Sequence, residues 1–162
     1  PRVDVDLWQF RRLVARSGEL ARTSGPDALD ALEDAVALWR GDPVQDLAAV
    51  AGLDADIEHI RSELVDAGLR LGEQLLTIGR FDRTLECVER CESASPYSER
   101  AHRLAIAAHL QLRDRDGLAR RVRLLRSILD DFAVEPEPAT AMLLARADEM
   151  LAHTDRGPVV TA

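Results

Sequence analysis

The amino-acid sequence predicts an all-α fold, in which about seven antiparallel helices build one superhelical domain. Three observations lead to this prediction. Ala and Leu number 24 each among the 162 residues, against twelve Val, five Ile and six Thr; Ala and Leu favour helices, whereas strands favour β-branched and aromatic side chains. Apolar residues recur at helical steps of three and four through most of the chain. No segment keeps the alternation of apolar and polar residues that marks a half-buried strand.

The first two helices are predicted from apolar spacing and from the residues that begin and end helices. The first covers residues 7–22, with Asp6 as its N-cap. A Ser-Gly-Pro sequence at residues 24–26 ends it and starts the second helix, which reaches about residue 39. A glycine and a proline shortly afterwards end that helix. Residues 44–53 are predicted to form a loop or a short helical turn.

The longest predicted helix covers residues 54–78 and carries a continuous apolar stripe. The stripe consists of Ile57, Ile60, Leu64, Ala67, Leu71, Leu75 and Ile78. It is longer than one partner helix of ordinary length, about twelve residues, can cover. Apolar surface left over there, or on the first helix, would favour a symmetric dimer.

Four shorter helices complete the predicted fold. Their predicted ranges are 81–92, 95–112 (with Ser95 as cap and Pro96 in the first turn), 118–131 and 139–152. The domain is therefore expected to span residues 1–153, and residues 154–162 are expected to form a flexible tail. Because the chain opens on Pro1 rather than Met, we also expect further sequence upstream.

Charge and composition exclude several classes of function. The chain has 29 acidic and 21 basic residues, for a net charge of -8, and such a domain repels a phosphate backbone. We therefore expect contact with DNA only through a domain upstream. No apolar run is long enough for a membrane span, and no secretion signal is recognisable. Two cysteines fall short of a disulfide framework, which indicates the reducing cytoplasm.

The spacing of small and apolar residues in the middle of the chain indicates a helical repeat. The pattern comprises Gly72, Leu75, Thr84, Val88, Cys91 and Pro96. It resembles the tetratricopeptide repeat, in which small residues lie where two helices cross and a proline closes the pair. Residues 31–43 duplicate the second half of this spacing, although the first helix of that pair lacks a small crossing residue. A third pair is a looser match, through Ala107, Leu110 and Ala119.

Five stretches in order along the chain resemble one family more specifically. They are residues 5–10 (VDLWQF), 35–43 (AVALWRGDP), 76–80 (LTIGR), 96–100 (PYSER) and 129–138 (LDDFAVEPEP). Together they resemble the bacterial transcriptional activator domain, over about residues 5–152. The resemblance implies a tetratricopeptide-like regulatory domain, usually placed after a winged-helix DNA-binding domain in actinobacterial regulators of antibiotic genes. Some members of the family belong instead to large multidomain proteins.

The residues that could take part in catalysis or metal binding are more simply explained by structural roles. Cys87 and Cys91 share one helix face, which indicates packing in the core, with metal binding or redox chemistry as the alternatives. The four histidines are scattered, and no nucleophile motif or glycine-rich phosphate loop is present. We therefore predict no catalytic residues, no metal and no cofactor. Trp8 and Trp39 are predicted to pack in the core rather than to anchor an interface.

One local cluster is basic. It consists of Arg113, Arg115, Arg120, Arg121, Arg123 and Arg126. The helical wheel places Arg120, Arg123 and Arg126 outward, opposite a buried arc of Leu118, Val122, Leu125, Ile128, Leu129 and Phe132. The simplest interpretation is a solvated face paired with neighbouring acids. The alternatives are a surface for an acidic partner and a secondary contact with DNA held by another domain.

These observations predict a non-catalytic, protein-binding regulatory domain of a bacterial transcription regulator. It would dimerise, or would contact other domains of its own chain or the transcription machinery, because stacked helix pairs build extended partner surfaces. The alternative is a tetratricopeptide-like scaffold in a larger multidomain protein not directly involved in transcription. An all-α enzyme is a more distant alternative.

Overall fold

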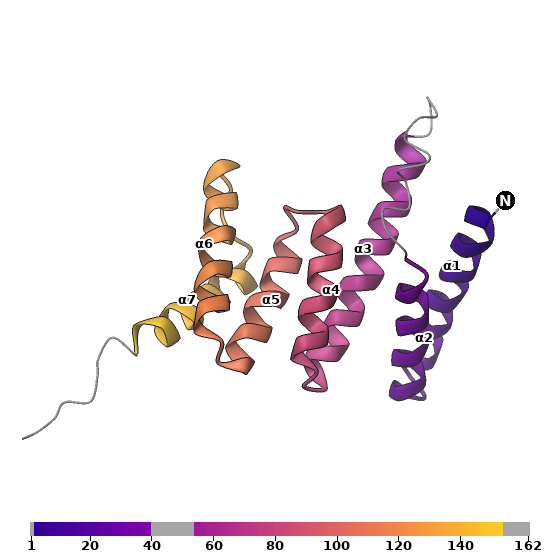
Figure 1. The fold of residues 1–162 in the computed structure, drawn as a ribbon, viewed down its shortest axis with the longest axis horizontal. Helices are drawn as coiled ribbons and strands as arrows, with labels where there is room; N and C mark the ends of the chain where they lie inside the picture. The colour runs from indigo at the N-terminus through magenta and orange to yellow at the C-terminus, as the bar shows by residue number, and fades with distance from the viewer. Residues whose placement is uncertain (1, 40–53, 154–162) are drawn as a thin grey trace, which may run out of the picture.

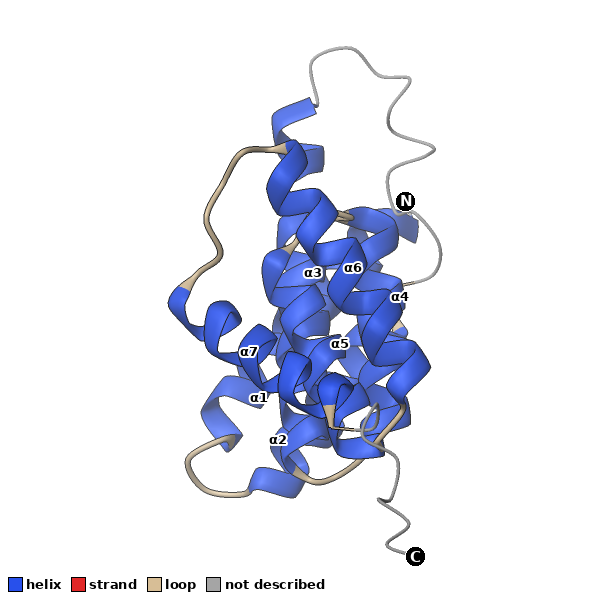
Figure 2. Ribbon diagram, turned by 90° about the vertical axis from the view of Figure 1, so that its left-hand side faces the viewer, coloured by secondary structure: helices blue, strands red, loops and turns tan. Residues whose placement is uncertain are grey.

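In the computed structural model, residues 2–39 and 54–153 are described, and this part of the chain folds into helices without a strand (Figure 1). The helices are α1 (Arg2–Leu20), α2 (Gly25–Ala37), α3 (Asp54–Thr77), α4 (Phe81–Ala94), α5 (Glu99–Leu112), α6 (Arg115–Asp131) and α7 (Pro138–Ala152). They stand side by side from α1 and α2 at one end to α6 and α7 at the other (Figure 1), and Figure 2 views this stack from the α7 end. The predicted all-α, tetratricopeptide-like fold is confirmed.

Several predicted helix boundaries need correction. Asp6 is not the N-cap of α1, because the helix already begins at Arg2 and residues 2–5 contain no glycine or proline to stop it. Ser95 is the C-cap of α4 rather than the N-cap of α5. The true cap of α5 is Ser98, whose hydroxyl accepts a hydrogen bond from Ala101 N.

The N-terminus of α6 lies three residues earlier than predicted. Asp114 is its N-cap, and one carboxylate oxygen accepts a hydrogen bond from Gly117 N at 3.0 Å. Hydrogen bonding to Gly117 is also the main reason why the pKa of Asp114 is lowered. The predicted end of α2 at Gly41 and Pro43, the predicted connection over residues 44–53 and the predicted tail over residues 154–162 lie outside the described residues.

The apolar stripe of α3 is largely covered. From Ile57 to Leu75 its side chains are buried or half-buried, and only Ile78 of the stripe is exposed. The cover comes from α2, α4 and α5, all of which contact α3. As predicted, the stripe is longer than one partner helix can cover, and several helices cover it together. Within the stripe, only its Ile78 end therefore remains exposed to a second copy.

The helix crossings use small residues, as the repeat pattern predicts. A Cβ atom at Gly72 would lie 2.6 Å from Cδ2 of Leu104, and one at Gly68 would lie 2.6 Å from Sγ of Cys91. In the first pair, where the repeat spacing indicates no small crossing residue, Ser17 of α1 supplies it. Its side chain is buried, and its hydroxyl donates to the carbonyl oxygen of Ala28 at 2.7 Å.

The third helix pair follows a different register from the predicted one. Ala107, Leu110 and Ala119 are only half-buried. On α6 the side chains of Leu118, Val122 and Leu125 are fully buried instead. Each of these lies one repeat of about 34 residues after Thr84, Val88 and Cys91, the matching positions of the second pair. The third repeat therefore keeps the spacing of the second, with leucine at the positions of Thr84 and Cys91 and valine again at that of Val88.

Candidate functional site

The predicted arginine face lies on the outer side of α6. Arg120, Arg123 and Arg126 are all exposed, in agreement with the helical wheel. Arg126 is engaged, since its Nη2 lies 2.6 Å from Oδ2 of Asp148 on α7. Arg120 and Arg123 form no ion pair with any residue that the structure describes. Of the three arginines, these two are thus the ones available to an anionic partner.

The buried arc opposite this face ends before Phe132. Leu118, Val122, Leu125 and Leu129 are buried, whereas Phe132 is 56% exposed. Phe132 is the C-cap of α6, and Ala133 then takes a left-handed backbone with φ 50°. A helical wheel does not extend past such a turn. The ring of Phe132 packs instead edge-on against Tyr97, with 5.1 Å between the ring centroids.

Arg121 points inward and takes part in a buried polar network. It pairs with Glu92 of α4, and its Nη1 lies 3.1 Å from Nδ1 of His102 on α5. The other ring nitrogen, Nε2, lies 3.1 Å from the carbonyl oxygen of Pro96. Burial lowers the pKa of His102, so the ring is neutral, with Nε2 donating to Pro96 and Nδ1 accepting from Arg121. The network ties α4, α5 and α6 together and leaves Arg121 unavailable to a partner.

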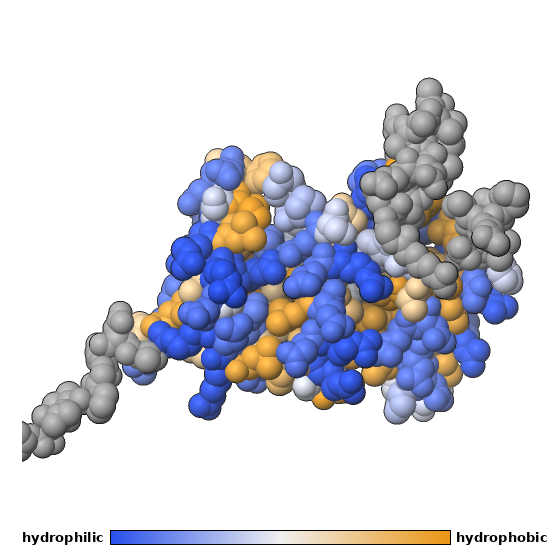
Figure 3. Space-filling view, in the orientation of Figure 1, coloured by the Kyte–Doolittle hydropathy of each residue, from blue (hydrophilic) through white to orange (hydrophobic). Residues whose placement is uncertain are grey.

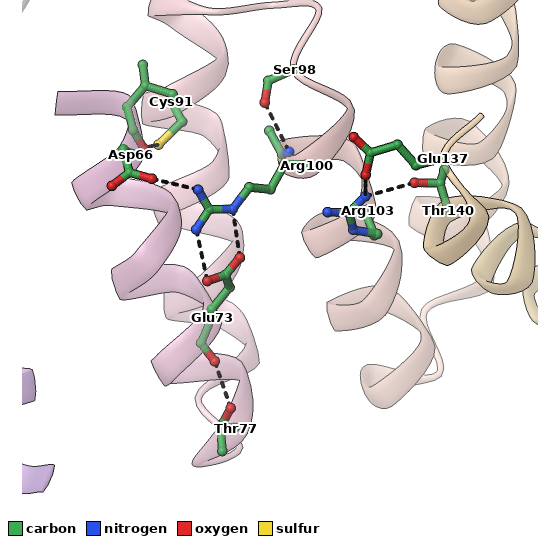
Figure 4. Close-up of polar contacts among 11 residues, drawn as sticks. Asp66, Glu73, Thr77, Cys91, Ser98, Arg100, Arg103, Glu137 and Thr140 are labelled. Atoms are coloured by element: carbon green, nitrogen blue, oxygen red, sulfur yellow. Dashed lines mark hydrogen bonds and ion pairs between the residues drawn. The ribbon is translucent and has the colours of Figure 1, made fainter. Parts of the chain in front are cut away.

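Two further arginines, which lie outside the predicted basic cluster, tie α5 to its neighbours (Figure 4). Arg100 binds Glu73 of α3 through two parallel hydrogen bonds of 2.8 and 2.9 Å, and Asp66 through a third of 2.7 Å. Arg103 donates to Glu137 at 2.7 Å and to Thr140 at 3.0 Å. These contacts join α5 to α3 and to the start of α7. The sequence does not reveal them, because the partners lie 27 to 37 residues away along the chain.

The cysteines lie in the core, as predicted for packing. Cys87 and Cys91 are free and buried, and Sγ of Cys91 lies 3.7 Å from the carbonyl oxygen of Val65. Burial raises the pKa of Cys87 to about 11 and that of Cys91 to about 12. Both thiols are therefore protonated at neutral pH. Within residues 2–39 and 54–153, no three His, Cys, Asp or Glu side chains come together as metal ligands.

The prediction that both tryptophans pack in the core is correct for one of them. Trp39 is buried in the central core cluster with α2 and α3 residues. Trp8, by contrast, is 64% exposed, and its ring lies 5.0 Å from the guanidinium of Arg12 one turn further along α1. The helix face toward α2 is filled instead by Phe10 and Ser17, which leaves Trp8 on the outer side.

Comparison with known proteins places most of the chain in one family. The family model described as bacterial transcriptional activator domain matches residues 5–146. A search of curated proteins finds no match. The matched region includes α2 to α6 complete and most of α1 and α7. None of the described helices is long and apolar enough to cross a bilayer.

Proposed function

Since the chain belongs to the family of bacterial transcriptional activator domains, which are regulatory and non-catalytic, we propose that it is the protein-binding module of a bacterial transcription regulator. The stack of seven helices in the described part of the chain supports a binding role, because helix pairs in a row present a long, rigid surface. The module would extend to residue 153, since α7 packs on α5 and α6 and buries Leu144 and Ala147 in the second core cluster.

The observation that carries the binding role is the exposed pair Arg120 and Arg123 on α6. The opposite side of this helix is anchored by Leu118, Val122 and Leu125, so the arginines stand on a rigid support. Arginine binds carboxylates through two parallel hydrogen bonds, which makes an acidic protein surface the matching partner. The partner would be a second copy, a neighbouring domain or the transcription machinery. Contact with DNA would come only through a domain upstream, and the location would be the cytoplasm.

A reporter assay tests this function. The chain is fused to an unrelated bacterial DNA-binding domain whose operator controls a reporter gene, and the double variant R120Q/R123Q is compared with wild type. We expect the double variant to lose most of the activation, while its circular dichroism stays unchanged. The control is R16Q, which removes one exposed arginine from α1 at the far end of the stack. A wild-type response of R120Q/R123Q, or an equal loss in R16Q, contradicts the role of the α6 face.

Self-association is a separate part of the proposal and needs its own measurement. Trp8 and Ile78 are exposed apolar side chains on α1 and at the end of α3 that a second copy would cover. Sedimentation equilibrium of the whole chain should then show a dimer, and Trp8→Ser should weaken it. A monomer at high micromolar concentration removes dimerisation from the proposal and leaves contact with other proteins in place.

A further inference from the structure

The end of α5, the start of α6 and the last turns of α7 line an open groove of about 750 Å³ on the surface. Its volume is in the range of ligand-binding clefts. Arg113, Arg115 and Arg146 line it, together with a single acidic side chain, Glu149. Such a lining is unusual in a chain whose net charge is -8. Figure 3 shows that strongly hydrophilic surface covers much of the molecule around α6 and α7, with apolar surface between.

Arg115 gives this groove a fixed wall. Its Nη1 and Nη2 atoms donate to the carbonyl oxygens of Met150 and Leu151, each at 2.7 Å. These carbonyls belong to the last turn of α7, so the guanidinium caps that helix and joins it to the start of α6. The positions of the other groove residues are therefore held by the packing of three helices.

Arg113 occupies a backbone position that normally favours glycine. It is the C-cap of α5, with φ 55° and ψ 28° in the left-handed region. A residue with a Cβ atom is strained in this region, whereas glycine is not. The side chain of Arg113 is exposed and forms no ion pair within the described part of the chain. Arg113 thus contributes a charged side chain to the groove from a backbone position that glycine would occupy without strain.

We propose that this groove binds an acidic peptide segment of a partner protein. Arg113 and Arg146, both exposed, would each take a carboxylate in a two-pronged contact. Leu110 and Met150, which also line the groove, would accept an apolar side chain between the two acids. Because the rest of the chain is acidic, a local basic groove attracts a short acidic segment more readily than a long nucleic acid. The inference rests on the proposed function and names a second contact for it.

The test uses a short fluorescein-labelled peptide in which Glu alternates with Leu, titrated with the whole chain by fluorescence anisotropy. We expect R113G and R146Q each to weaken binding roughly tenfold, because each variant removes one charge-assisted hydrogen-bonded pair with the peptide. R16Q is the matched control for net charge and should bind as wild type. A peptide with Lys in place of Glu should not bind, and a labelled DNA duplex should bind more weakly than the acidic peptide.

Stability measurements separate binding from folding. R113G should raise the midpoint of thermal unfolding, because glycine relieves the left-handed backbone. Ala133→Gly is the matched control, since Ala133 has the same kind of backbone with φ 50° outside the groove. It should raise the midpoint as well and leave peptide binding unchanged. The groove is supported if both variants gain stability and only R113G loses peptide binding.

Three results would overturn this inference: wild-type binding in R113G and R146Q, an equal loss in R16Q, or tighter binding of the DNA duplex than of the peptide. The reporter assay keeps this failure distinct from a failure of the proposed function. If peptide binding does not depend on the groove while activation still depends on Arg120 and Arg123, the groove is wrong and the regulatory role stands. If activation is insensitive to the α6 face while the peptide binds the groove, the role of the α6 face is wrong and the groove stands as the contact.

Discussion

At the scale of single residues, the crossing of α3 with its neighbours depends on the absence of a side chain at Gly72. A leucine there would collide with Leu104, which already lies 2.6 Å from the position of a Cβ atom, and would press on Cys87. We expect Gly72→Leu to reduce the free energy of unfolding by about 1–3 kcal/mol through overpacking. Urea unfolding followed by circular dichroism measures this.

Gly18 provides the control for this substitution. A Cβ atom at Gly18 on α1 would have no heavy atom within 4 Å, apart from its own helix. Gly18→Leu should therefore be neutral or slightly stabilising, because leucine is the better helix former. Equal effects of the two substitutions would show that the repeat register around Gly72 is wrong.

The cysteines allow a second prediction at this scale. Because burial raises their pKa values to about 11 and about 12, neither thiol is ionised at pH 8 and neither is accessible. We expect alkylation by iodoacetamide to be at least roughly a hundredfold slower in the folded chain than in urea, where both thiols react. Mass spectrometry after a time course measures the rates. Fast labelling of either cysteine in the folded chain would contradict the burial of this face of α4.

Single residues also show where prediction from the sequence ends. Cys91 was predicted to be buried because the repeat assigns it a core position, and this is confirmed. Trp8 was predicted to be buried with the core of the first two helices, and this is wrong, because the tight contact of α1 with α2 uses Phe10 and Ser17. The sequence shows which side chains are apolar. Only the packing of two helices determines which of these side chains lie between them.

At the scale of helices, two serine caps with different hydrogen bonding give a matched comparison. Ser98 accepts a hydrogen bond from Ala101 N at the start of α5, whereas Ser24 makes no side-chain bond at the start of α2. We expect Ser98→Ala to cost about 1 kcal/mol of stability and Ser24→Ala clearly less. Thermal unfolding by circular dichroism measures both. A larger loss for Ser24→Ala would contradict the assigned caps.

The start of α5 also shows which helix boundaries could be predicted from the sequence. A serine followed by a proline at residues 95 and 96 has the pattern of a cap, and so does Ser98 followed by Glu99. Only the second serves as one, since Ser95 closes α4 and residues 96–97 form a turn. The existence and order of the helices followed from their apolar period. The exact ends of the helices depend on which of several possible capping residues is not already used by the neighbouring helix.

At the scale of the whole molecule, ion pairs join helices that are not paired within one repeat. Arg100 connects α5 to α3, and Arg121 connects α6 to α4. These links engage several of the arginines in contacts between helix pairs. Arg120 and Arg123 on α6, and Arg113 and Arg146 at the groove, remain exposed. The candidate partner surfaces therefore follow from the fold and not from the number of basic residues in the sequence.

The distribution of charge leads to the last prediction, that the chain by itself does not recognise DNA. A net charge of -8 opposes a polyanion, and Lys and Asn, two of the side chains that read bases, are absent from the sequence. The exposed arginines of α6 lie on a helix whose ends carry Asp114, Asp116, Asp130 and Asp131, and whose other side is packed in the core. The helix therefore has only one open face, with acidic residues at both of its ends, to present to a duplex. Any binding to a promoter-sized duplex at about physiological ionic strength, ~0.15 M, should be weak, independent of sequence and abolished by a modest increase in salt.

Fluorescence anisotropy with two duplexes of different sequence and stepwise added salt measures this. Binding that resists salt and distinguishes the two duplexes would turn the α6 arginines into a DNA site and would remove the need for a separate DNA-binding domain.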